Sequence, residues 1–197
     1  MQLMAFILLC IFWLLFMGRT VMLMLRGVRV LVLAKGKSLP ERLIEIVLMP
    51  ALILWSLQIG FTVFGVPLIP APAFWEMPAI QLAGIILCAL GLVMFVFALI
   101  SFGSSWRVGI DEERSGKLVT GGIFAVTRNP IYLFMDLYIA GTFLIFPNWF
   151  FLAFLVLSAA GIHRQILNEE KFLRRKYGEA YVAYTRKVPR YLCAKKP

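Results

Sequence analysis

The sequence predicts an all-α integral membrane protein with about five membrane-spanning helices, and its composition is the first reason. Hydrophobic residues make up 61% of the 197 residues and charged residues only 15%, and the mean hydropathy is +0.88. A typical soluble domain is roughly half apolar and about 25% charged. This composition therefore excludes an ordinary soluble domain.

Long apolar runs predict where the helices lie, because a membrane span takes about 20 apolar residues. The last run begins at Trp149 and turns polar after Ile162 without a helix breaker, so we expect this helix to leave the bilayer and continue. The other expected spans are residues 3–17 (with a continuation over 19–34 as an option), 43–66, 79–103 and 131–146.

Positive charges lie in alternate connections along the chain, which has a formal net charge of +10. Lys and Arg gather in residues 34–42, in residues 104–128 and in the tail after His163, whereas the connections 67–78 and 147–148 contain neither. Cytoplasmic loops carry the excess of Lys and Arg. We therefore expect the N-terminus outside and a cytoplasmic, helical C-terminal extension, and the charge does not call for a nucleic-acid partner.

The cysteines do not predict a disulfide framework or a zinc site. There are three of them, Cys10, Cys88 and Cys193, and a single histidine, His163. Their spacing matches no metal motif. We expect no metal.

Polarity divides the chain into residues 1–103, with the first three helices, and residues 104–197, with most of the interior polar groups. In the second part, residues 116–126 (GKLVTGGIFAV) alternate apolar residues with paired glycines, which favours an extended, tight-turned backbone over a helix. The long fifth helix is expected to end at Gly178, and a short amphipathic helix to end before Pro189.

Asn129 and Pro130 mark the start of the fourth helix, because Asn favours the N-cap and Pro the first helical position. A helix N-terminus attracts anions, and Arg128 lies beside it. Both features fit a single negative group at the membrane surface. The alternative is that Arg128 contacts lipid phosphates.

The tight turn at Pro147 and Asn148 makes helices four and five antiparallel, so residues equally far from the turn lie side by side. Small residues at 158–161 (SAAG) are expected to let the two helices approach closely. The count brings the start of helix four beside the acidic pair of helix five, where an Arg, a helix N-terminus and carboxylates could hold a zwitterion. The residues brought together are Arg128, Tyr132, His163, Arg164, Glu169 and Glu170.

These segments carry a family resemblance. KLVTGGIFAVTRNPIYLF, the turn at Pro147 and NEEKFLRRKYGEAYVAYTRKVPR resemble the isoprenylcysteine carboxyl methyltransferases and the broader group of membrane methyltransferases that includes the phospholipid N-methyltransferases. The resemblance covers residues 104–191. Each motif alone is a weak signal, but their order on these helices makes the combination specific.

The resemblance implies an S-adenosylmethionine site closed by a cofactor loop between helices three and four, by helices four and five and by the tail, with S-adenosylhomocysteine as product. Glu169 would bind the ammonium or ribose of the cofactor, and Glu170 would support it. The full set of cofactor candidates is Lys117, Leu118, Val119, Phe124, Asn129, Pro130, Ile131, Tyr132 and Glu169, to which the depth count adds His163.

Three positions depart from the family pattern. Asn129 replaces a His, and Phe134 replaces a Gly and is expected to narrow the groove beside helix four. Gln165 replaces an Arg associated with substrate in the prenylcysteine enzymes, and we expect it and Arg164 at the substrate. Asp136 and His163 each have two interpretations, a functional group or a hydrogen-bonded structural residue.

The acceptor is expected to be a lipophilic molecule from the bilayer, with its site on the cytoplasmic side. An isoprenylcysteine-like carboxylate comes first, and it would need a cation, Arg128 or Arg164. A phospholipid ethanolamine is the alternative, and it would need a base, Glu170, His163 or Asp136. Arg128 and Glu170 are the catalytic candidates. The rival functions are an NADPH-dependent membrane reductase and a non-enzymatic membrane protein.

Overall fold

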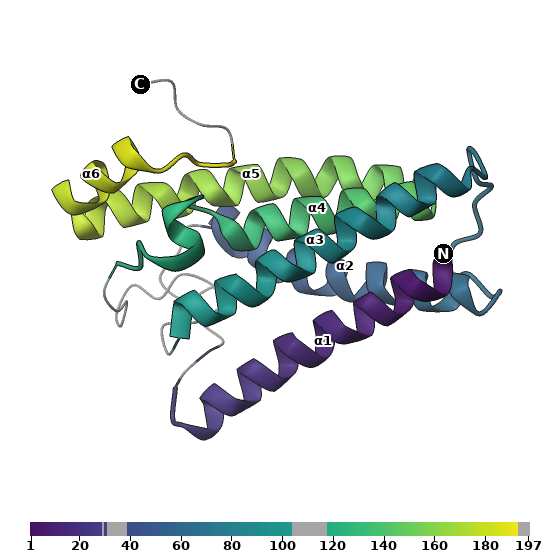
Figure 1. The fold of residues 1–197 in the computed structure, drawn as a ribbon, viewed down its shortest axis with the longest axis horizontal. Helices are drawn as coiled ribbons and strands as arrows, with labels where there is room; N and C mark the ends of the chain where they lie inside the picture. The colour runs from purple at the N-terminus through teal and green to yellow at the C-terminus, as the bar shows by residue number, and fades with distance from the viewer. Residues whose placement is uncertain (29, 31–38, 104–117, 193–197) are drawn as a thin grey trace.

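The computed structural model describes residues 1–28, 30, 39–103 and 118–192, the side chains of residues 39–46 excepted. The regular structure of these residues is entirely helical (Figure 1). Its elements are α1 (Gln2–Leu25), α2 (Leu39–Val63), α3 (Pro78–Phe102), the short 3₁₀ helix η2 (Gly122–Ala125), α4 (Pro130–Ile145), α5 (Trp149–Tyr177) and α6 (Glu179–Lys187).

The helices begin and end close to the predicted positions. Pro78 and Pro130 stand at the first turns of α3 and α4, where the missing N–H of proline costs nothing. The side chain of Asn148 caps α5 by accepting a hydrogen bond from the N–H of Phe151 at 3.2 Å. Gly178, with φ of +52°, separates α5 from α6. The continuous α5 and the short α6 are thereby confirmed.

The connection before α4 differs from the prediction in part. Residues Gly122–Ala125 form one turn of 3₁₀ helix instead of an extended backbone. Gly122 has φ of +61°, which glycine adopts without steric cost. The N–H of Ile123 donates to Ser101 Oγ at 3.2 Å, so this turn is attached to the end of α3.

Three of the described helices, α1, α3 and α5, are long and apolar enough to cross a membrane. Two further apolar helices are shorter, Val47–Val63 within α2 and Pro130–Ile145. The chain thus has membrane-type helices, and a count of five spans stays a prediction. The N-terminus lies at the end of the bundle opposite to α6 (Figure 1).

Helices α3 and α4 form the closest pair, because glycines replace side chains along their contact. A Cβ at Gly84 would lie 2.6 Å from the carbonyl oxygen of Gly141, and one at Gly91 would lie 3.1 Å from the carbonyl oxygen of Phe134. The prediction of close approach at residues 158–161 of α5 is wrong in this respect. Nothing lies within 4 Å of a Cβ at Gly161, and Ala159 and Ala160 are exposed.

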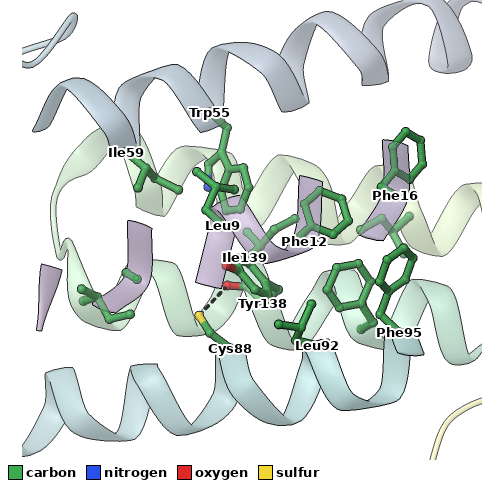
Figure 2. Packing of buried hydrophobic residues seen from close by; sticks show 14 of the residues in the cluster. Leu9, Phe12, Phe16, Trp55, Ile59, Cys88, Leu92, Phe95, Tyr138 and Ile139 are labelled. Carbon is green, nitrogen blue, oxygen red and sulfur yellow. Dashed lines mark hydrogen bonds between the residues drawn. The ribbon is translucent and has the colours of Figure 1, made fainter. Parts of the chain in front are cut away.

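Aromatic side chains from α1 to α5 fill the centre of the bundle (Figure 2). Phe134 is 4% exposed, stacks on Phe95 with a centroid distance of 4.7 Å and contacts Phe12 at 5.3 Å. It therefore packs against α1 and α3, and its expected narrowing of a groove beside α4 stays a prediction. Residues from both predicted parts of the chain share this core, so their division at residue 103 stays a prediction.

Candidate functional site

The polar residues singled out in the sequence meet at the α6 end of the bundle. Three segments bring them together: η2 with the start of α4, the polar half of α5, and the tail at residues 188–192, which follows α6 (Figure 1). The tail runs back along α5, because Arg190 and Tyr191 contact Glu170 and His163 in turn.

Glu170 of α5 joins the start of α4 to the tail. Its Oε1 accepts hydrogen bonds from Arg128 Nη2 at 2.7 Å and from Arg190 Nε at 3.0 Å. Its Oε2 accepts from Arg190 Nη2 at 2.7 Å. We call Arg128, Glu170 and Arg190 the arginine clamp. The predicted meeting of Arg128 with the acidic pair is confirmed, and its partner there is the second glutamate.

Arg128 is the more deeply buried of the two arginines. Its side chain is 7% exposed, against 35% for Arg190. Its Nη1 donates to the carbonyl oxygens of Val188 at 2.8 Å and Thr185 at 3.2 Å. The Nε of Arg128 is buried and has no hydrogen-bond partner among the described residues. Arg128 therefore contacts protein groups in place of lipid phosphates and keeps one donor unused.

Backbone hydrogen bonds attach the tail to the residues before α4. The N–H of Arg128 donates to the carbonyl oxygen of Pro189 at 3.0 Å. The carbonyl oxygen of Arg190 accepts from Thr127 Oγ1 at 3.1 Å and from Asn129 Nδ2 at 3.2 Å. Asn129 thus holds the N-cap position of α4 without capping it through its side chain. The capping role expected of its side chain is wrong, because that side chain binds the tail.

A second, smaller core supports this arrangement from α6. Tyr181 and Tyr184 are buried there together with Val188. The hydroxyl of Tyr184 donates to the carbonyl oxygen of Phe124 at 2.6 Å. Phe124 is itself 6% exposed and meets Phe102 edge-on at 4.7 Å. These contacts hold η2 between α3 and α6.

The charges of the arginine clamp act on its titratable groups. Burial by itself would raise the pKa of Glu170, but the hydrogen bonds and charges of Arg190 and Arg128 outweigh it, and the pKa falls below its ordinary value of 4.5. The hydrogen bonds to Glu170 raise the pKa of Arg190. Burial, followed by the charge of Glu170, raises the pKa of Tyr181 to about 12. Glu170 is therefore ionised at neutral pH.

One further polar contact lies nearer to the apolar part of α5. His163 Nδ1 and the hydroxyl of Tyr191 are 2.8 Å apart, and the two rings are nearly parallel, at 20°. Burial, followed by the charge of Asp136 on α4, raises the pKa of Tyr191. The only histidine of the chain thus has a hydrogen-bond partner from the tail.

The other predicted site residues differ in how deeply they are buried. Lys117 lies outside the described residues. Buried positions are Phe124, Asn129, Pro130 and Gln165; half-buried positions are Leu118, Val119, Ile131, Tyr132 and Glu169; exposed positions are His163 and Arg164.

Sequence reasoning missed the tail residues Arg190 and Tyr191, which contact Glu170 and His163. The signal available was an arginine directly after Pro189, the residue before which α6 was expected to end. An irregular tail has no periodicity, so its path could not be derived from the sequence.

A separate cavity of about 480 Å³ lies at the opposite end of the bundle. It is lined by residues of the α2–α3 connection, such as Trp75 and Glu76, and by the α4–α5 turn. Within the described part of the chain, no cluster of three or more His, Cys, Asp or Glu side chains could hold a metal ion.

Comparisons with known proteins show which families the sequence resembles. The family model described as phospholipid methyltransferase matches residues 80–180, which include most of α3 and all of α4 and α5. The protein-S-isoprenylcysteine O-methyltransferase B of Arabidopsis thaliana is 30% identical over 109 residues, 54% of this chain and 55% of that protein. The protein-S-isoprenylcysteine O-methyltransferase of Xenopus laevis is 27% identical over 121 residues, 60% of this chain and 42% of that protein.

These matches span about half the length of each relative. The resemblance to the isoprenylcysteine and phospholipid methyltransferases is nevertheless confirmed, because the family model covers 101 residues, from 80 to 180, of the 197. The chain belongs to the phospholipid methyltransferase family.

Proposed function

We propose that this protein is an S-adenosylmethionine-dependent membrane methyltransferase that methylates a lipophilic acceptor drawn from the bilayer. The observation that carries the proposal is the direct contact of Arg128, at the start of α4, with Glu170 of α5 at 2.7 Å. This contact places Glu169 and the N-terminus of α4 at the same end of the bundle, inside the segment that the family model matches.

The residues present suit the amino-acid end of the cofactor. The buried Nε–H of Arg128 has no partner among the described residues, and the Asn129 side chain does not cap α4. A carboxylate between them would satisfy the orphaned donor and gain from the helix dipole. Glu169 follows on α5 as the counter-charge for the ammonium group. When bound, the cofactor would supply a methyl group on a sulfonium centre.

Glu170 acts in this proposal as a positioning residue, whereas Arg128 would contact the cofactor through its Nε–H. Both carboxylate oxygens of Glu170 are bound to arginines, so its role is to hold the tail against α4 and α5. The remaining contacts of the cofactor are assigned to Lys117, Leu118, Val119, Phe124, Pro130, Ile131, Tyr132 and His163. The site faces the cytoplasm if the basic end of the bundle does.

The isoprenylcysteine-type carboxylate is the first acceptor to test, because both curated relatives are named for isoprenylcysteine. An ionised carboxylate needs no base, only a cation that orients it. Arg164 is exposed on α5 and is the cation for this role, beside Gln165.

A phospholipid amine is the second acceptor, favoured by the family description and by the charges at the site. Arg128 and Arg190 are both bound to Glu170, while the charge of Asp136, after burial, contributes to the raised pKa of Tyr191. An acidic group near the membrane suits a cationic acceptor better than an anionic one.

Thermal unfolding in detergent tests the proposal. S-adenosylhomocysteine should stabilise the protein, by about 2.7 kcal/mol at a hundredfold excess over its Kd, and NADPH should not. Glu169→Ala should abolish the stabilisation, whereas the control Glu179→Ala, at an exposed position of α6, should retain it. Stabilisation by NADPH alone would favour the reductase alternative, and none by either ligand would exclude the proposed cofactor.

Labelled S-adenosylmethionine then identifies the acceptor. The purified protein is incubated with a farnesylcysteine analogue or with phosphatidylethanolamine vesicles, and the lipid product is counted. Transfer to neither acceptor would contradict the proposed reaction even if the cofactor binds.

A further inference from the structure

The cavity of about 480 Å³ at the end of the bundle opposite to the arginine clamp has the size and lining of a binding site. Pockets that hold small molecules measure about 300–1,000 Å³ and combine apolar walls with a few polar groups. Here the polar groups come from separate elements: Gln2 from the start of α1, Glu76 from the α2–α3 connection and Gln81 from α3. None of these three side chains has a hydrogen-bond partner among the described residues, so each is available to a ligand. We call this space the Glu76 cavity.

Hydrogen bonds hold the walls of the Glu76 cavity in place. Gln58 is 1% exposed and exchanges two hydrogen bonds of 2.9 Å with the backbone of Ile69, which attach the start of the α2–α3 connection to α2. The N–H of Phe74 donates to the carbonyl oxygen of Pro147 at 2.6 Å, which attaches the same connection to the α4–α5 turn. A ligand that enters a preformed site pays little for ordering it.

Glu76 gives the cavity a negative charge. It is the only charged residue among the described residues that line the cavity, and the connections 67–78 and 147–148 contain no Lys or Arg. Glu76 is exposed, so a ligand can reach its carboxylate from the water. A carboxylate that has no cationic partner attracts a cation and repels an anion.

Aromatic side chains stand beside this carboxylate. Trp75 directly precedes Glu76 and lines the same cavity, and its ring meets Phe143 edge-on with a centroid distance of 5.6 Å. Phe146, which is 3% exposed, is a second aromatic residue of the lining. The face of an aromatic ring, and of an indole above all, attracts an ammonium group. A carboxylate next to such rings is therefore suited to an ammonium ligand.

We propose that the Glu76 cavity binds a small organic cation through its ammonium group. Glu76 supplies the counter-charge, Trp75 the aromatic wall, and Gln2 and Gln81 hydrogen bonds to the polar groups of the ligand. A metal ion fits less well, because no cluster of three or more His, Cys, Asp or Glu side chains exists within the described part of the chain. The ammonium group can belong to a soluble amine or to a lipid head group. This binding site is separate from the arginine clamp and does not rest on the proposed methyl transfer.

Thermal unfolding of the full chain in detergent tests the preference for charge. Choline and its uncharged isostere 3,3-dimethylbutan-1-ol have the same shape, so a site that recognises the ammonium group should be stabilised by choline and not by the alcohol. Glu76→Gln removes the charge and keeps the size of the side chain, and Trp75→Leu removes the aromatic face. Each should weaken choline binding about tenfold or more. Glu179→Gln, at an exposed position of α6, is the matched control and should bind choline as the wild type does.

Two short-chain lipids, used below their micelle concentrations, separate the two sources of the ammonium group. Dihexanoylphosphatidylcholine and dihexanoylphosphatidylglycerol share their chains and differ in their head groups. Stabilisation by choline itself indicates a soluble amine, and stabilisation by the phosphatidylcholine alone indicates a lipid head group; both should be lost in Glu76→Gln. Without ligand this variant should unfold at the wild-type temperature, because the Glu76 side chain has no partner to lose. Equal stabilisation by choline and the alcohol, unchanged stabilisation of Glu76→Gln, or no stabilisation by either cationic probe would overturn the proposal.

Discussion

At the scale of single residues, the burial of Arg128 decides how the site is held together. A guanidinium that is 7% exposed has lost most of its hydration, which is costly unless counter-charges and hydrogen bonds replace water. Glu170 and two backbone carbonyls provide that replacement. The arginine clamp is therefore a condition for folding this end of the molecule as well as for shaping the site.

Glu170→Gln tests the clamp. The variant keeps the shape of the side chain but leaves Arg128 and Arg190 without their shared negative charge, so we expect a loss of about 2 kcal/mol in the free energy of unfolding at pH 7. Arg190→Gln should cost less, because Arg190 is 35% exposed. Thermal unfolding in detergent measures both, and Glu179→Gln is the control.

The arginine clamp also predicts how the stability difference between wild type and Glu170→Gln depends on pH. Because the pKa of Glu170 is lower in the folded protein than its ordinary value of 4.5, its stabilisation is complete above about pH 4.5 and is lost as the pH falls through the lower, folded value. The stability difference between wild type and Glu170→Gln should thus be constant from pH 5 to pH 8 and should shrink below pH 4.5. A difference that grows on acidification would contradict the clamp.

The sequence predicted some of these residue contacts and missed others for physical reasons. The meeting of Arg128 with Glu170 follows from helical rise and a tight turn, which are regular. The contacts of Arg190 and Tyr191 depend on an irregular tail. Asn129 illustrates a competition: its residue type favours capping, but the carbonyl oxygen of Arg190 binds its amide instead.

At the scale of the elements, hydropathy predicted where the helices lie but not which face of each helix packs against a neighbour. Apolar runs and the breakers Pro130 and Gly178 placed α4 and α5 within a residue or two of their ends. Small residues occur on α3, α4 and α5 alike, so composition alone does not tell which of them lie in a contact. The structure places the close approach between α3 and α4, at Gly84 and Gly141.

Gly84→Ala and Gly141→Ala test this packing. The added Cβ would lie 2.6 Å from a backbone carbonyl oxygen in both cases, so α3 and α4 must separate, and we expect destabilisation of about 1–3 kcal/mol. Gly161→Ala is the matched control: its Cβ meets nothing within 4 Å, and Ala favours a helix by about 1 kcal/mol over Gly. Equal effects of the three substitutions on thermal unfolding would show that α3 and α4 do not pack this way.

At the scale of the whole molecule, the connections that lack Lys and Arg share one end of the bundle. The two connections without Lys or Arg lie at the end of the bundle that holds the N-terminus, and α6 lies at the other end (Figure 1). The packing of the helices around their aromatic core does not depend on the charges of the connections. Its agreement with the distribution of Lys and Arg is therefore independent of the argument from the sequence. It supports an odd number of crossings, with the N-terminus and α6 on opposite sides of the membrane.

Thiol labelling in sealed vesicles tests this topology. Gln2→Cys and Lys187→Cys are each introduced into a chain with Cys10, Cys88 and Cys193 replaced by Ser, because α1 begins and α6 ends at these exposed positions. A membrane-impermeant maleimide added outside should label only one of the two variants, and vesicles of opposite orientation should label only the other. Detergent should make both reactive, which controls for accessibility. Labelling of both variants from one side would mean an even number of crossings, and α2 or α4, the shorter apolar helices, would then fail to span the bilayer.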